Sequence, residues 1–66
     1  MLPNHIYDLM CQIVQESQSL WRITKEYKGN AADCDKLVKF WERMEKDKEE
    51  HIDELEKLLL EQLKSE

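Results

Sequence analysis

The stretch IYDLMCQIVQESQSLWRITKEY, residues 6–27, decides the fold of this chain. Apolar residues and one acid recur in it with alternating steps of three and four. That spacing places them along one face of a single helix. The seven positions are Ile6, Leu9, Ile13, Glu16, Leu20, Ile23 and Tyr27. We therefore predict one helix with a nearly continuous apolar face, interrupted only by Glu16.

The second half of the chain has a similar apolar pattern with its own polar interruption. Asp47, Lys48 and His51 stand in the middle of that pattern. Its apolar members are Leu37, Phe40, Trp41, Met44, Ile52, Leu55, Leu58 and Leu59. A carboxylate such as Glu16 is costly to bury unless a basic group or a metal ion compensates its charge. The two interruptions are therefore candidate partners of each other.

A short turn separates the two patterns. Gly29 and Asn30 tolerate positive φ, which favours the end of a helix. Asn4 is placed to cap the first helix, and Asp33 or Asp35 to cap the second. A short connection joins antiparallel neighbours. We predict a single all-α hairpin domain over residues 1–66, with helix one over about residues 4–28, a turn over 29–33 and helix two over about 34–64.

Composition narrows the classes of function. The chain has a net charge of -5, and it contains 15 acids against 10 bases. Residues 1–30 carry equal numbers of acids and bases, so all of the net charge lies in the second half. This acidity disfavours binding to nucleic acid and to anionic membranes. No basic start followed by an apolar run marks a signal peptide, and we expect a cytoplasmic protein.

The size of the chain predicts self-association. Two helices that bury one stripe each make a marginal core for 66 residues. We expect a homo-oligomer with an even number of chains, in which two hairpins pair into a four-helix bundle. Trp21 and Trp41 lie close to level across the predicted hairpin, and we expect them to pack between helices or at an oligomer contact.

The aligned interruptions predict half of a metal site. Antiparallel pairing brings Glu16 level with residues 44–47, and Asp47 and His51 share one face of helix two because they are four residues apart. One acid from helix one and an acid and a histidine from helix two are typical ligands of iron or manganese. A second chain would supply the other half. Glu16, Asp47 and His51 are therefore the candidate metal ligands.

The stretch KDKEEHIDEL, residues 46–55, resembles the second metal-binding helix of the ferritin-like and rubrerythrin-like superfamily. Glu16 resembles the metal-binding glutamate of the family's first helix. A short hairpin that dimerises is similar to the half-ferritins, such as the encapsulated ferritins. The resemblance implies a di-iron carboxylate protein that binds iron at a dimer interface, oxidises ferrous iron as a ferroxidase, and lies within an enclosing protein shell.

The sequence departs from the family at one position and leaves two arrangements open. The family's motif is Glu-x-x-His, and Lys48 stands three residues before His51. Asp47, one position earlier, is the nearest acid. If Asp47 faces Glu16, the pair can bind metal; if Lys48 does, its ammonium replaces the metal. The second arrangement describes a metal-free oligomerisation or protein-interaction module, which is the alternative function.

Overall fold

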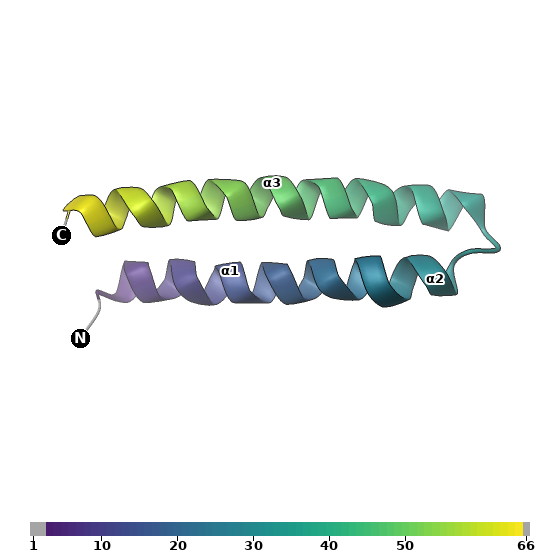
Figure 1. Cartoon of the computed structure of the whole chain (residues 1–66), viewed down its shortest axis with the longest axis horizontal. Helices are drawn as coiled ribbons and strands as arrows, with labels where there is room; N and C mark the ends of the chain where they lie inside the picture. The colour runs from purple at the N-terminus through teal and green to yellow at the C-terminus, as the bar shows by residue number, and fades with distance from the viewer. Residues whose placement is uncertain (1–2, 66) are drawn as a thin grey trace.

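The computed structural model describes residues 3–65 and is an all-helical hairpin (Figure 1). The first arm is one continuous rod made of helix α1 (Asn4–Arg22), a π-helical turn η1 (Ile23–Tyr27) and a last helical turn α2 (Lys28–Asn30). The second arm is helix α3 (Asp35–Ser65). The prediction of two helices joined by a short turn is confirmed. The pairing of two hairpins into a bundle stays a prediction.

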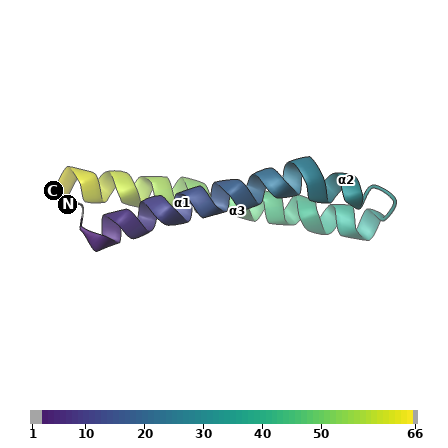
Figure 2. The ribbon, with the colours of Figure 1, turned by 90° about the horizontal axis from the view of Figure 1, so that it is seen from below.

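The two arms lie side by side along their whole length, with the turn at one end and both termini at the other (Figure 1). The hairpin measures 49 × 17 × 12 Å. Seen from the second direction, the arms cross at a shallow angle near their middle (Figure 2). Such a crossing is typical of helices whose contact residues recur every three and four positions, because the contact face of each helix then drifts slowly around its axis.

Two predictions about helix ends need correction: that Asn4 caps the first helix, and that Gly29 and Asn30 end it. The Pro3 carbonyl accepts bonds from the Ile6 and Tyr7 N–H groups at 3.1 Å, so the helix begins at Asn4 and the asparagine side chain does not cap it. No residue from 3 to 65 has a positive φ, Gly29 included. The first arm therefore continues through Asn30. It ends at Ala31, whose φ of -96° and ψ of 9° leave the helical region.

The face of α1 that packs on α3 is the predicted one. All seven predicted positions are buried or half-buried. On α3 five of the eight predicted positions are half-buried: Trp41, Met44, Ile52, Leu55 and Leu59. The other half-buried members of the contact face are Val38, Glu45, Lys48 and Gln62. Leu37, Phe40 and Leu58, which were predicted to pack, are exposed instead. We call the two facing rows the hairpin seam.

The core of a single hairpin is small. Within residues 3–65 only Ile6, Ile23 and Ala31 are buried. Near the turn the rings of Tyr27 and Trp41 pack with their centroids 5.1 Å apart. None of the helices described is long and apolar enough to cross a membrane. The seam alone therefore leaves much of the apolar content of the chain in contact with water.

Candidate functional site

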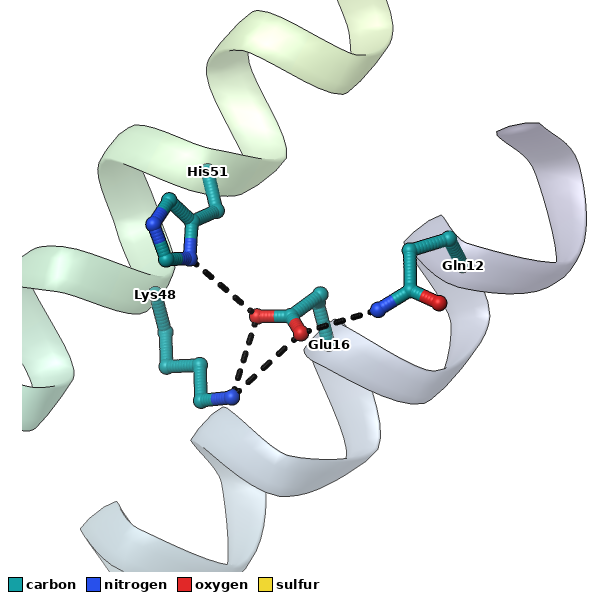
Figure 3. Close-up of polar contacts among 4 residues, drawn as sticks. All are labelled: Gln12, Glu16, Lys48 and His51. Carbon is teal, nitrogen blue, oxygen red and sulfur yellow. Dashed lines mark hydrogen bonds and ion pairs between the residues drawn. The ribbon is translucent and has the colours of Figure 1, made fainter.

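The interruption in the seam is a cluster of four polar side chains, made of Glu16 and the three residues around it (Figure 3). Lys48 Nζ lies 3.3 Å from Glu16 Oε1 and 3.1 Å from Oε2, and Gln12 donates a 3.0 Å hydrogen bond to Oε1 from one turn earlier on α1. His51 Nδ1 lies 3.7 Å from Oε2. Both side chains of the ion pair are largely removed from water, since Glu16 is 13% and Lys48 19% exposed.

One oxygen of Glu16 is incompletely bonded. Oε2 is buried, and neither Lys48 nor His51 reaches it with hydrogen-bond geometry. Lys48 is close enough for a strong charge interaction, whereas the His51 nitrogen stands beyond hydrogen-bonding distance. His51 is also 62% exposed, so its ring remains open to solvent. The cluster thus has a compensated charge and one unused acceptor.

The electrostatic balance keeps Glu16 ionised. Burial alone would raise the pKa of its carboxyl, because a charged group loses solvation there. The hydrogen bond and positive charge of Lys48, the hydrogen bond from Gln12 and the charge of His51 act in the opposite direction. Together they outweigh burial, and the pKa of Glu16 is lowered from its ordinary value. The carboxylate is therefore the stable form at neutral pH, with Lys48 as its main counter-charge.

The structure brings together two of the three predicted metal ligands. Glu16 and His51 meet across the seam, but Asp47 is exposed, and no ion pair or hydrogen bond joins it to Glu16 in the described part of the chain. Lys48 occupies the place next to Glu16. Across residues 3–65 no group of three or more His, Cys, Asp and Glu side chains is positioned to hold a metal ion. The predicted iron site stays a prediction that this geometry does not test.

A groove opens beside the cluster along one edge of the hairpin. It has a volume of about 390 Å³. Its lining residues are Gln12, Glu16, His51, Glu54, Leu55 and Leu58. A second hollow of about 640 Å³ shares Gln12, Leu55 and Leu58 with it and extends toward His5 and Asp8. We call these two hollows the polar groove, because acids and histidines stand along its apolar floor.

Sequence reasoning missed a second carboxylate in the seam. Glu45 accepts a 2.6 Å hydrogen bond from the Thr24 hydroxyl and a 3.0 Å bond from Lys28 Nζ. The Thr24 bond first, and then the Lys28 bond, lower the pKa of Glu45 despite burial. A signal was present in the sequence, because Val38, Glu45, Ile52 and Leu59 are spaced by seven residues.

The π-helical turn lies at the level of Glu45. The Lys28 N–H bonds to the Ile23 carbonyl, five residues earlier, in place of the usual four. Ile23 remains buried and Tyr27 remains against Trp41, while Thr24 and Lys28 both reach Glu45. Both oxygens of this carboxylate are therefore bonded, in contrast to those of Glu16. Glu45 joins the arms, and each of its two oxygens has a hydrogen-bond partner.

Comparison of the chain with protein-family models, with curated proteins and with solved structures found no match. The class of protein that the geometry defines is an antiparallel helical hairpin with an ion pair across its middle. Its function is inferred from the seam, the groove and the exposed faces alone.

Proposed function

We propose that this hairpin is a metal-free self-association module, in which two copies pair into a four-helix bundle. The observation that carries the proposal is the mismatch between a very small core and a large exposed apolar surface. Among residues 3–65 three side chains are buried, too few to offset the conformational entropy that the chain loses on folding. Most chains of this size gain the missing burial from another chain, a metal or disulfides.

The exposed apolar residues are numerous and large. Within the described residues, 3–65, nine are at least two-fifths exposed: Tyr7, Met10, Val14, Trp21, Leu37, Phe40, Leu58, Leu60 and Leu63. Single exposed hydrophobic residues are normal on a soluble protein. A set of this size that includes Tyr7 and Trp21, at 61% and 56% exposed, is typical of a surface that another helix covers.

The Glu16–Lys48 ion pair supports the metal-free form of the proposal. An ammonium already stands where a bridging metal would compensate the Glu16 carboxylate. A polar pair within an apolar seam contributes less to stability than to register, since only one alignment of the arms lets the charges meet. In this role Lys48 fixes how α1 and α3 align, and the exposed faces remain free to bind a second copy.

One observation keeps the di-iron hypothesis as a second candidate. Glu16 and His51 lie together at the border of the polar groove, and Glu54 lines the same groove. Iron binding there would require Lys48 to leave its place beside Glu16. Replacing Lys48 by glutamate would remove the competing ammonium and restore the spacing of one carboxylate three residues before His51.

Native mass spectrometry of protein prepared with ferrous iron distinguishes the two functions. For the unmodified chain, of mass 8.0 kDa, we expect a metal-free dimer. Lys48→Glu should gain bound iron, and the matched control Lys46→Glu, at an exposed position two residues away, should not. Iron bound to the unmodified dimer and lost in Glu16→Ala would overturn the metal-free proposal. A monomer at every concentration would overturn self-association.

A further inference from the structure

The outer face of α1 carries a second row of residues with the same spacing as the seam. Tyr7, Met10, Val14 and Trp21 follow the seam positions Ile6, Leu9, Ile13 and Leu20 by one residue each. They therefore lie along one line of the helix, beside the seam. All four are exposed. We call this row the α1 edge.

We propose that the α1 edge binds the α1 edge of a second copy in antiparallel orientation, around a two-fold axis near Val14. This inference rests on the proposed self-association and names its surface and register. Tyr7 and Trp21 each lie seven residues from Val14. An antiparallel pair centred on Val14 places Tyr7 of each copy opposite the partner's Trp21, so the same surface serves both chains, as a two-fold interface requires.

The charges of α1 suit such a pair. From position 7 to position 21 the α1 edge contains no charged residue, and the intervening place, Ser17, is small. Opposed helix dipoles favour the antiparallel orientation.

The exposed apolar area is close to what a stable dimer buries. Leu60 and Leu63 are exposed on α3 at the level where α1 begins, and their heptad positions place them on the same side as the α1 edge. With the four edge residues they offer on the order of 500 Å² of apolar surface, taking about 150–250 Å² for each whole aromatic side chain. A standard interface buries roughly 800 Å² per partner, of which somewhat more than half is apolar.

The opposite edge of the hairpin fits a second copy less well. Leu37, Phe40 and Leu58 are exposed there, but Asp47, His51 and Glu54 stand between them in the same heptad positions. Antiparallel pairing of two such rows would bring acids of one acidic α3 against acids of the other. Like charges at the centre of an interface oppose association. The α1 edge is thus the one of the two surfaces that no charged residue interrupts.

Cysteine cross-linking tests the register. In a background with Cys11→Ser and Cys34→Ser, Val14→Cys should form a covalent dimer quickly with a short bifunctional thiol reagent. Tyr7→Cys and Trp21→Cys should each react slowly alone and quickly when the two variants are mixed. Leu58→Cys is the matched control on the opposite edge. Self-linking of Tyr7→Cys would instead indicate parallel pairing, and fast linking of Leu58→Cys would indicate the other edge; either result overturns the inference.

Charge substitution gives an independent readout. Val14→Glu should raise the dimer dissociation constant at least 100-fold while circular dichroism shows that the helices persist at high concentration, whereas Leu58→Glu should change it less than fivefold. A dimer that tolerates Val14→Glu and dissociates with Leu58→Glu would contradict the α1 edge yet leave self-association standing. An unmodified chain that stays monomeric would remove both proposals.

Discussion

The two tryptophans of this chain belong to different surfaces of the same hairpin. Trp41 is half-buried in the seam, with Tyr27 and Phe40 each at a ring-centroid distance of 5.1 Å. Trp21 lies on the outer side of α1 and is more than half exposed. The Trp41 ring packs against aromatic rings of its own chain, whereas the Trp21 ring is mostly exposed to solvent. The contrast teaches that the apolar content of this sequence exceeds what a single seam can bury.

The largest expected effect comes from replacing each tryptophan by alanine. Trp41→Ala should lower the free energy of unfolding by about 2–4 kcal/mol at every protein concentration, somewhat below the cost for a fully buried tryptophan because Trp41 is only half-buried. Trp21→Ala should destabilise the protein only at concentrations where dimers form. Urea unfolding at two concentrations a hundredfold apart measures both. If both variants lost the same unfolding free energy at both concentrations, Trp21 would not belong to a dimer surface distinct from the seam.

Replacing the Glu16–Lys48 ion pair should have an effect of intermediate size on the unfolding free energy. Replacing Glu16 by leucine together with Lys48 by methionine makes the seam continuously apolar, and we expect a change in unfolding free energy between zero and about 3 kcal/mol in the stabilising direction. Glu16→Leu alone should be less stable than the double variant, because it leaves Lys48 without its counter-charge. Thermal unfolding of the unmodified chain, of Glu16→Leu and of the double variant measures these differences in stability. A double variant clearly weaker than the unmodified chain would mean that the ion pair itself stabilises the hairpin.

The smallest effect is a dependence on pH that belongs to the seam. The pKa values of Glu16 and Glu45 are lower in the folded chain than ordinarily, so their contribution is complete above a pH of about 4.3–4.5 and is lost as the pH falls through the folded pKa. Unfolding at pH 6 and at pH 3 should show this loss, reduced in Glu16→Gln. The matched control Glu49→Gln, at an exposed position, should keep it.

The sequence predicts α1 well because only one face of it fits a heptad that spans seven positions. It predicts the contact face of α3 less completely because apolar residues occupy two neighbouring faces, one with Val38 and Ile52 and one with Leu37 and Leu58. Choosing between those faces is the same as choosing between Lys48 and Asp47 as the neighbour of Glu16. Only the packed arms make that choice.

The position of the polar cluster along the length of the hairpin was predicted to within a few residues. Glu16 was expected opposite residues 44–47, and it meets Lys48 and His51. The shift follows from the turn, because the first arm runs on through Asn30 instead of ending at about Lys28. The predicted end relied on positive φ, which neither Gly29 nor Asn30 adopts. The incompletely bonded oxygen of Glu16 depends on side-chain geometry and has no signal in the sequence.

The most direct test of the central claim is the fluorescence of Trp21 during dilution, measured in a Trp41→Phe variant. If a second copy covers the α1 edge, Trp21 should emit at short wavelength in concentrated protein and shift to the wavelength of an exposed indole on dilution. The shift should share its midpoint with the loss of dimer in sedimentation. An emission typical of exposed indole at concentrations where the protein is still dimeric would contradict the claim.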